Sequence, residues 1–276
     1  MKEVDLHICR ARGLNDYQAC AKLQKEVWGF SDIKDIVPQP ILLIGNEYGG
    51  SVLIAEEPRS GVVGFSFAML GRRAGGGLIW WSHMTGVSEA RRGRRIGFRL
   101  KLAQREDALK NGVSEIWWTF DPLQAMNAHF NLRKLGAVVS KYEENVYGLS
   151  SSPLHNGMPT DRFVAKWHLE SDRVKDRITG ETPVILRNFD RLVPIIEANK
   201  ERPSPPALEL DDNLLSLEIP TNFNNLQKLE PTLARDWQQL VRLACRHYFS
   251  QGYVMTDFIL ADTPKPKALY LLEKQH

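Results

Sequence analysis

An apolar run over residues 78–87 is followed at once by a cluster of arginines, and the cluster leads into a segment with the character of a helix. Four arginines occur within residues 91–95, interrupted only by Gly93. The pattern predicts a strand, a tight basic loop and a helix over residues 97–111, which Gly112 ends. The N-terminus of a helix leaves main-chain amides unpaired, glycine lets an anion approach the main chain, and arginine adds bidentate hydrogen bonds. The loop therefore meets the physical requirements of a phosphate-binding site.

Two other interpretations of this loop remain. A bare run of charged residues is often only a solvated turn, and a basic patch can bind nucleic acid. The 36 lysines and arginines are nearly balanced by 33 aspartates and glutamates, so the chain offers no wider basic face. No aromatic platform is interleaved with the arginines, since the tryptophan pairs at 80–81 and 117–118 lie in strands where one of each pair is expected to face the core. Nucleic-acid binding is therefore the weakest of the three interpretations.

The composition is that of a soluble globular protein. Of 276 residues, 43% are hydrophobic and 25% charged, which allows one large domain or two modest ones. The three cysteines are odd in number and widely spaced, which argues against a disulfide framework and against a zinc site. His129 and His155 have no cysteine or acidic partner at metal-ligand spacing, so we expect no metal site. No apolar segment has the roughly 20 residues that a membrane span needs, and the first residues do not resemble a signal peptide. We expect a cytoplasmic protein.

The first 168 residues predict alternating strands and helices. A helix is expected over residues 14–29 and a short one over 126–137, which Gly136 ends. The expected strands are residues 4–11, a hairpin of 51–57 with 62–70, and then 77–87, 114–121, 138–148 and 162–170. The turn-rich segment 155–163 is expected to be a surface loop. This order indicates an α/β (α+β) fold.

The pattern changes after residue 168. Residues 170–213 are charged and irregular and include the stiff sequence RPSPP, so they predict a linker. A strand is expected at 214–220, and a helix begins at Pro231 and ends before Gly252. Two further strands are expected at 253–262 and 267–274. We expect residues 169–276 to form an additional C-terminal α/β segment.

The sequence GVSEARRGRRIGFRL (residues 86–100) resembles the cofactor loop of the Gcn5-related N-acetyltransferase (GNAT) superfamily. In that family a strand ends in Val-x-Pro-x-x-Arg-Gly-x-Gly-x-Gly/Ala, and the positions that match in register are Val87, Arg92, Gly93, Ile96 and Gly97. The order of elements to about residue 168 is also similar, and NAHFNLRKLGA (residues 127–137) resembles the family's late helix. More narrowly, a subfamily of predicted acetyltransferases without a settled substrate is resembled by residues 118–139 and 147–167, and the resemblance extends to LEIP (217–220) and FSQGYVMTDF (249–258).

The resemblance implies a fold and a cofactor. The fold would be a central mixed, mostly antiparallel sheet flanked by helices, in an acetyl-CoA-binding domain of residues 1–168. The loop would bind the pyrophosphate of coenzyme A, and the pantetheine arm would lie between the strands of residues 78–87 and 115–121, which splay apart. The residues implied in cofactor binding are Val87, Arg92, Gly93, Arg94, Arg95, Ile96, Gly97 and Asn127.

Three positions depart from the family pattern. The middle glycine is Arg95, which removes one close approach to the main chain and adds a cation. The proline is Glu89. The tyrosine that often protonates the departing thiolate in the family falls on Leu132, so the usual acid is absent there.

Acetyl transfer to an amine needs a base, a donor for the thioester oxygen and stabilisation of the thiolate. The resemblance implies that the amide of Val87 or of its neighbour is the donor. His83 lies on the strand that usually carries the base, and the other reading, which the residue taken alone favours, is a half-buried, hydrogen-bonded and inert histidine. Asp121 either orients the amine or acts as a base, or it caps the turn at Pro122. Asn127 contacts the pantetheine, or is an N-cap, or does both.

The leading hypothesis is a CoA-dependent N-acyltransferase that acetylates a small-molecule amine or a protein amine. The alternative is a non-catalytic acyl-CoA-binding sensor or partner module, which Leu132 favours. The acceptor, the length of the acyl chain, the oligomeric state and any role of the C-terminal segment in shaping the acceptor site do not follow from the sequence.

Overall fold

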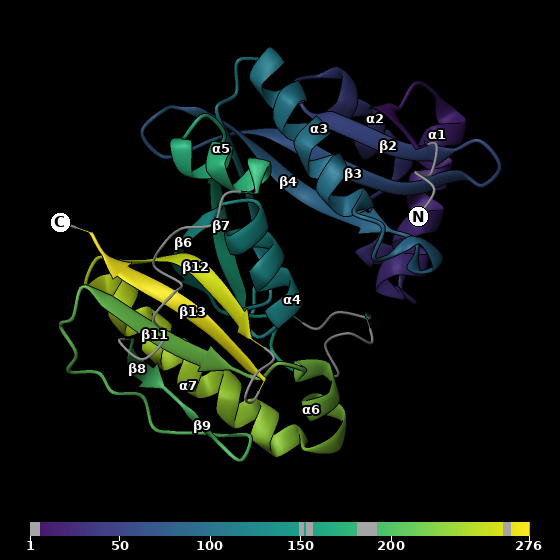
Figure 1. Ribbon diagram of the computed structural model, residues 1–276. Helices are drawn as coiled ribbons and strands as arrows, with labels where there is room; N and C mark the ends of the chain where they lie inside the picture. Colours follow the sequence, from purple (N-terminus) through teal and green to yellow (C-terminus); the bar gives the residue numbers. More distant parts are fainter. Residues whose placement is uncertain (1–5, 149–151, 153–156, 181–191, 262–265, 276) are drawn as a thin grey trace. The chain divides into compact units, whose positions relative to one another are not determined.

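The computed structural model describes residues 6–148, 152, 157–180, 192–261 and 266–275 (Figure 1). The chain divides into two compact units. Unit 1 holds residues 1–118 and 150–155, and unit 2 holds residues 119–149 and 156–276, within which only the described residues are discussed. The division falls inside one strand, so the two units are described separately.

Unit 1 is built on a mixed, mostly antiparallel sheet. Its strand order follows the chain, and each neighbouring pair is antiparallel except the last, which is parallel. The strands are β1 (His7–Arg10), β2 (Ser51–Glu57), β3 (Gly61–Arg72), β4 (Leu78–Val87) and β5 (Glu115–Phe120). The parallel pair β4–β5 is joined by a helical crossover, as parallel strands require.

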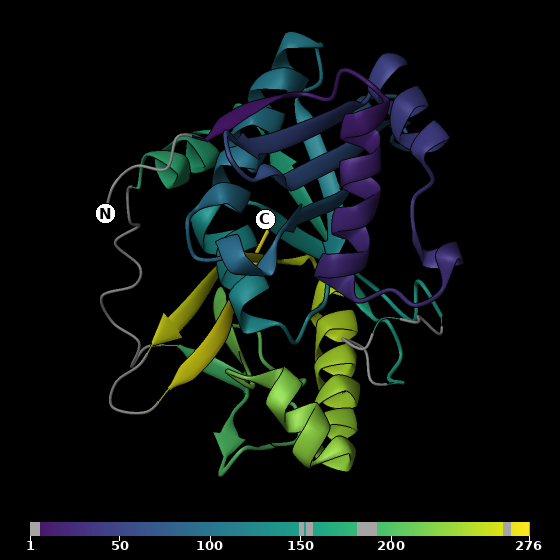
Figure 2. The same cartoon turned by 90° about the vertical axis from the view of Figure 1, so that its right-hand side faces the viewer.

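Helices cover both faces of this sheet. On one face lie α1 (Leu14–Trp28) and α2 (Gln39–Glu47), and on the other lies α3 (Ile96–Lys110), as Figures 1 and 2 show. Alternate residues of β2 follow this division, because successive side chains of a strand point to opposite faces. Val52 and Ile54 pack with α1 and α2, whereas Leu53 and Ala55 pack with Ile96 and Leu100 of α3. The sheet therefore separates two apolar cores.

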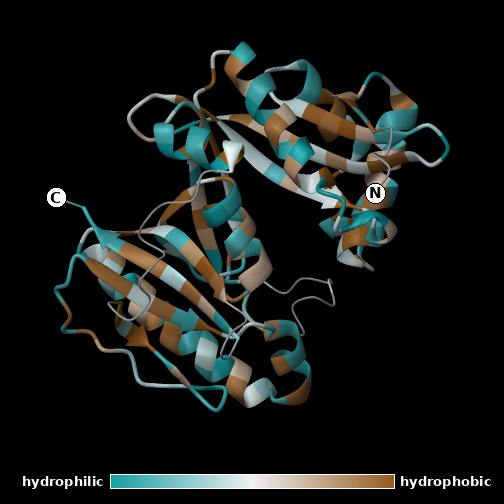
Figure 3. Cartoon of the chain, viewed as in Figure 1, coloured by the Kyte–Doolittle hydropathy of each residue, from teal (hydrophilic) through white to brown (hydrophobic). Residues whose placement is uncertain are grey.

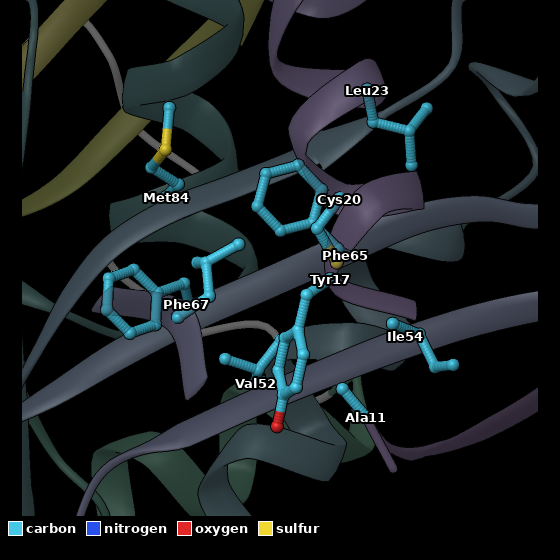
Figure 4. Packing of buried hydrophobic residues seen from close by; sticks show 10 residues of the cluster. Ala11, Tyr17, Cys20, Leu23, Val52, Ile54, Phe65, Phe67 and Met84 are labelled. Atoms are coloured by element: carbon cyan, nitrogen blue, oxygen red, sulfur yellow. The ribbon is translucent and has the colours of Figure 1, made fainter. Parts of the chain in front are cut away.

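The core under α1 and α2 is drawn in Figure 4, with Tyr17 and Cys20 against Phe65. The hydroxyl of Tyr17 accepts a hydrogen bond from the buried Asn46 amide at 3.1 Å, and the same amide group also donates to the Ala11 carbonyl. The helix α1 ends at Gly29, whose φ of 66° lies in the left-handed region that glycine adopts without strain.

Unit 2 contains a second set of mostly antiparallel strands in the order β7-β6-β12-β13-β11-β8, of which the pair β11–β8 is parallel. The strands are β6 (Val138–Glu143), β7 (Arg162–His168), β8 (Val193–Ile196), β11 (Leu214–Ile219), β12 (Tyr253–Ala261) and β13 (Lys267–Lys274), and a separate short pair is formed by β9 (Ala198–Asn199) and β10 (Arg202–Pro203). The helices are α4 (Ala125–Ala128), α5 (Asp172–Thr179), α6 (Phe223–Leu229) and α7 (Pro231–Ser250), and a π-helical segment η3 (His129–Lys134) continues α4.

The core of unit 2 is aromatic. The ring of Phe163 contacts those of Phe120, Tyr142 and Tyr270 edge-on, with centroids 5.4 to 5.6 Å apart. Helix α7 buries the stripe that its sequence predicts, including Trp237 and Ala244, and Figure 3 shows hydrophobic colour along the central strands of both units. Aromatic edge-to-face contacts add to the free energy gained by burial.

The expected fold class, a mixed and mostly antiparallel sheet flanked by helices, is confirmed. Most predicted elements occur within a few residues of their predicted bounds; β2 spans residues 51–57 as predicted, and α3 spans 96–110 against the predicted 97–111. The two compact units are defined by contacts within the chain, and they do not test where an acetyl-CoA-binding domain ends. The expected extent of that domain, residues 1–168, stays a prediction.

Three local expectations differ from the structure. Helices α2 and α6 have no counterpart among the predicted elements. The segment 170–213, expected to be an irregular linker, contains α5, β8, β9 and β10 within its described part. The segment 155–163 was expected to be a surface loop, and residues 155 and 156 lie outside the described residues. In its described part, Met158, Thr160 and Asp161 are buried. Asp161 accepts hydrogen bonds from the side chains of Tyr142 and Arg242.

Candidate functional site

Strand β4 carries a β-bulge at His83. Phe67 of β3 pairs with Met84 and the next residue, Ala68, pairs with Ser82, so His83 is the extra residue of β4. The imidazole ring meets that of Phe67 edge-on at 6.2 Å, and it has no hydrogen-bond partner within the described chain. Burial lowers the pKa of His83 below its ordinary value of 6.5. The imidazole is therefore neutral at pH 7 and can accept a proton.

The chain bends sharply between β4 and α3. A single 3-10 turn, Glu89–Arg91 (η2), follows β4, and both Gly93 and Arg95 then adopt left-handed conformations with φ of 79° and 59°. Arg95 is the N-cap of α3, but no side chain caps this end of the helix. The first-turn amides, from Ile96 onward, have no partner within the helix because no carbonyl precedes them at the required spacing. The bend thus presents main-chain donors at the positive end of a helix.

The arginines of the bend have different environments. Arg91 is tied down: its Nε lies 2.9 and 2.8 Å from the two carboxylate oxygens of Glu57, and its Nη2 lies 2.9 Å from the Ser60 hydroxyl. Arg94 is 3.9 Å from Glu57. Arg92 and Arg95 are exposed and have no carboxylate partner among the described residues, although the guanidinium of Arg95 lies over the Phe98 ring at 5.4 Å. Arg92 and Arg95 are thus left for a ligand, and Arg94, whose side chain is 43% exposed, is held within the described chain only by this long contact.

The bend fits a diphosphate in three respects. The first turn of α3 holds no acidic residue that would repel an anion. A Cβ at Gly93 would meet no atom within 4 Å, so the main chain there is open, and a Cβ at Gly97 would meet only Val87, at 3.9 Å. Arginine matches phosphate oxygens with paired donors. The residues present therefore suit the pyrophosphate of a nucleotide cofactor.

A hydrogen bond of Ser88 indicates which main-chain amide at the end of β4 is available to a substrate oxygen. Val87 is the last residue of β4, and the amide of Ser88 donates to the Val63 carbonyl at 2.9 Å. The Ser88 amide is therefore committed to the fold. The family resemblance suggested the amide of Val87 or of its neighbour as the donor to a substrate oxygen. Because the Ser88 amide is already hydrogen-bonded, the Val87 amide stays as the candidate.

Strands β4 and β5 pair over a short distance. The parallel register joins Trp80 to Ile116 and Trp81 to Trp117, although β4 continues to Val87. Ser82 and Trp118 are the next residues on the two strands. The expected parting of these strands accordingly begins at Ser82 and Trp118, both of which belong to unit 1.

Lys101 of α3 lies at this point, and sequence reasoning missed it. Its Nζ donates to the Ser82 hydroxyl at 2.8 Å and to the Gln104 side-chain oxygen at 3.0 Å, and it lies 4.0 Å from the centre of the Trp118 ring. The residue is 3% exposed. Burial lowers the pKa of Lys101 from 10.5 to about 7.

Asp121 belongs to unit 2 and performs the turn-capping role that the sequence left as an alternative. Its Oδ1 accepts a hydrogen bond from the Leu123 amide at 2.9 Å, and its carbonyl accepts one from the Gln124 amide. Burial raises the pKa of the Asp121 carboxyl, against the opposing effect of that amide. The second role, toward a substrate amine, stays a prediction.

The N-cap interpretation of Asn127 is wrong. Helix α4 begins at Ala125, its N-cap is Gln124, and Asn127 is an exposed residue within it. The helix starts two residues before the asparagine, so Asn127 cannot cap its N-terminus. Leu132, in the π-helical segment that follows, is fully buried, so this position supplies no acid.

The structure brings together one group of the predicted residues. His83, Val87, Arg92, Gly93, Arg94, Arg95, Ile96 and Gly97 all lie on β4, the bend or the start of α3 in unit 1, whereas Asp121 and Asn127 lie in unit 2. In the described part of the chain, no cluster of three or more His, Cys, Asp or Glu residues is arranged to hold a metal ion. Nor does any described helix combine the length and hydrophobicity that crossing a membrane requires.

No protein-family model and no curated protein matches the chain. Solved structures do resemble it. The Escherichia coli ribosomal-protein-S18-alanine N-acetyltransferase is 11% identical over 60% of this chain and 95% of its own, with a TM-score of 0.48. A GNAT-family acetyltransferase from Streptococcus pneumoniae is 14% identical over 59% and 98%, with a TM-score of 0.47. The putative acetyltransferase yncA from Salmonella typhimurium, solved with its cofactor acetyl-CoA, is 19% identical over 60% and 95%, with a TM-score of 0.47.

All three are acetyltransferases by name. Because the identities are below 20% and the TM-scores below 0.5, we base a functional proposal on the residues of this chain.

Proposed function

We propose that the chain is a CoA-dependent N-acyltransferase of the GNAT superfamily, which transfers an acetyl group from acetyl-CoA to a small-molecule amine or a protein amine. The observation that carries the proposal is the bend before α3. Its two left-handed residues, Gly93 and Arg95, precede the uncapped first turn of a helix, and two exposed arginines stand beside that turn without carboxylate partners among the described residues. We assign the cofactor to residues 1–168 and treat residues 169–276 as an extension.

The diphosphate of the cofactor would be held by the bend. The amides near Gly93, Ile96 and Gly97 would donate to its oxygens, and Arg92, Arg94 and Arg95 would supply charge and side-chain hydrogen bonds. When bound, the cofactor supplies an acyl group activated as a thioester. The pantetheine arm would run along β4 toward the point where β4 and β5 part, at Ser82 and Trp118.

His83 is our candidate for the base. Its neutral imidazole, on the bulge of β4, has a lone pair with which to take the proton that the acceptor amine loses. The amide of Val87 is our candidate donor to the carbonyl oxygen, where negative charge develops. Asp121 is kept as a candidate for orienting the amine, and Asn127, which is exposed, as a candidate contact to the pantetheine.

Binding and turnover should be measured on the same protein. Acetyl-CoA binding is followed by titration calorimetry, and thiol release is followed in the presence of a panel of amines that includes small diamines, amino acids and lysine peptides. We expect saturable binding and release of thiol that depends on at least one amine. Lack of binding to CoA would refute the proposal.

A non-catalytic acyl-CoA-binding module is the second candidate, and one observation favours it. Leu132 is buried where the family resemblance puts a tyrosine, so no acid protonates a departing thiolate from that position. Saturable binding without thiol release on any amine of the panel would support this candidate over the enzyme. Thiol release on any amine of the panel would refute it, and the pH profile of His83→Gln would then test whether His83 is the base.

A further inference from the structure

Lys101 places an amine in the interior of unit 1. The residue is 3% exposed, and its Nζ is enclosed by the Ser82 hydroxyl, the Gln104 amide oxygen and the face of the Trp118 ring. The polar contacts are neutral groups, and no ion pair involves Lys101 within the described residues. Desolvation is the sole cause of the lowered pKa of this lysine, which means that no neighbouring charge compensates for its burial.

Such an arrangement costs stability. Burying an ammonium group without a counter-ion costs much free energy of folding. If the amine is neutral instead, folding must supply the free energy of removing its proton. An apolar side chain of the same length would pack at this position without that cost. A residue that opposes stability is commonly explained by function.

The position of the amine suggests which function. Trp80–Ile116 and Trp81–Trp117 are the pairs that join β4 to β5, and Ser82 and Trp118 come next on the two strands. The amine contacts both of these residues, so it bridges the strands at the point where they begin to part. If the proposed function is correct, the groove for the cofactor lies between the two strands where they part. Lys101 would lie at the closed end of this groove.

We propose that Lys101 is a specificity-determining residue that closes the acyl end of this groove and restricts the protein to short acyl groups. The proposal rests on the proposed function, since it assigns the groove to the pantetheine and acyl group. An alkyl chain longer than acetyl would have to displace the amine from Ser82 and Trp118, and it would leave polar groups unpaired against hydrocarbon. We expect a two-carbon acyl group to stop short of that contact.

The test compares the full-length wild-type protein with Lys101→Met. Methionine keeps an unbranched chain of similar length and removes the amine. Dissociation constants are measured for CoA, acetyl-CoA and hexanoyl-CoA, together with the thermal midpoint of each unliganded protein. We expect Lys101→Met to bind CoA within twofold of wild type, to improve hexanoyl-CoA relative to acetyl-CoA by at least fivefold, and to melt at or above the wild-type temperature.

A ratio of hexanoyl-CoA to acetyl-CoA affinity within twofold of wild type, with CoA still bound, would overturn the inference and leave the proposed function intact. Equal weakening of all three ligands would also overturn it, because that result indicates a general structural role. Failure of the wild-type protein to bind CoA would refute both. Should Lys101→Met not fold, Ser82→Ala is decisive in its place: it must shift the ratio in the same direction, and an unchanged ratio overturns the inference.

Discussion

Arg91 and Glu57 form a two-point ion pair in which the guanidinium Nε lies 2.9 and 2.8 Å from the two carboxylate oxygens. The pair joins the 3-10 turn after β4 to the end of β2. Hydrogen bonds from Arg91 and Ser60 outweigh the opposing effect of burial and lower the pKa of Glu57. Arg91 is therefore an anchor of the bend, and the cations available to a ligand are its neighbours.

Removing the charge of Glu57 should loosen this anchor. Glu57→Gln is expected to reduce the free energy of unfolding by roughly 1.5 to 3 kcal/mol at pH 7, the range for a hydrogen bond to a charged group. Because the folded-state pKa is lowered, the wild-type contribution is present above pH 4.5 and is lost as the pH falls below it. Urea unfolding at several pH values measures both effects, with Glu56→Gln as the neighbouring control. Equal losses in the two variants would contradict the anchoring role.

Arg95 occupies the left-handed region with φ of 59°, a conformation that costs a side-chain-bearing residue roughly 1 kcal/mol or more. Arg95→Gly should raise the free energy of unfolding by about 0.5 to 1 kcal/mol after the greater chain entropy of glycine is subtracted. Arg94→Gly is the matched control, because Arg94 is not in the left-handed region, and it should lower stability. Chemical denaturation decides, and a loss of stability in Arg95→Gly as large as that in Arg94→Gly would show that the conformation carries no strain.

The lowered pKa of His83 fixes the expected pH dependence of activity. If His83 is the base, kcat/KM should fall only below pH 6.5, where the imidazole becomes protonated. His83→Gln should reduce kcat/KM by about 100-fold or more and should lose that acidic limb. His7→Gln, which changes an exposed histidine, should leave the profile as in wild type. An unchanged acidic limb in His83→Gln would assign the titration to another group.

Lys101 predicts a second pH dependence, in stability rather than in activity. Its pKa falls from 10.5 to about 7 on folding, so between these values the unfolded chain binds the proton and the folded chain does not. Stability should therefore rise with pH across this window by up to about 1.4 kcal/mol per pH unit, and the gain should disappear as the pH falls to 7. The difference in unfolding free energy between wild type and Lys101→Met isolates this slope, and a difference that is independent of pH would show that the buried amine keeps its ordinary pKa.

The buried arginine cluster of unit 2 makes a prediction about folding alone. Asp257 Oδ2 accepts from Arg133 at 3.0 Å and from Arg177 at 2.6 Å, and the side chains of Arg177 and Asp257 are only 3% and 8% exposed. Asp257→Asn would leave two guanidinium groups without their counter-charge, at an expected cost of about 3 kcal/mol or more. Denaturant unfolding measures this cost, and a change below 1 kcal/mol would mean that solvent compensates for the lost carboxylate.

Periodicity predicted the strands and long helices where one face of an element is apolar. Helix α7 is the simplest case, because Pro231 marks its first residue and its buried stripe is continuous. Helix α2 could not be found in this way. Its apolar residues Ile41, Leu43 and Ile44 are 45% to 52% exposed, so the segment lacks the polar outer face by which amphipathic helices are recognised.

The site shows the same limit. The sequence predicted the bend because glycine and arginine next to a helix start have a direct physical meaning, and the φ values of Gly93 and Arg95 follow that pattern. Lys101 was missed because a lysine in a helix ordinarily faces solvent. A signal was present: Lys101 and Gln104 lie on the same face as Leu100 and Ala108, which is why α3 shows no clean apolar stripe in sequence.

The most direct measurement of the central claim, that main-chain amides around Gly93 bind a diphosphate, is the CoA affinity of Gly93→Asp beside that of Gly93→Asn. Both variants add a similar side chain at a φ of 79° with no atom within 4 Å, so they share the same strain and differ in one negative charge. We predict that the dissociation constant for CoA is at least tenfold higher in Gly93→Asp than in Gly93→Asn, and that Asp and Asn at Gly112, which also has a positive φ, bind CoA alike. Equal affinities of the two Gly93 variants would contradict the claim.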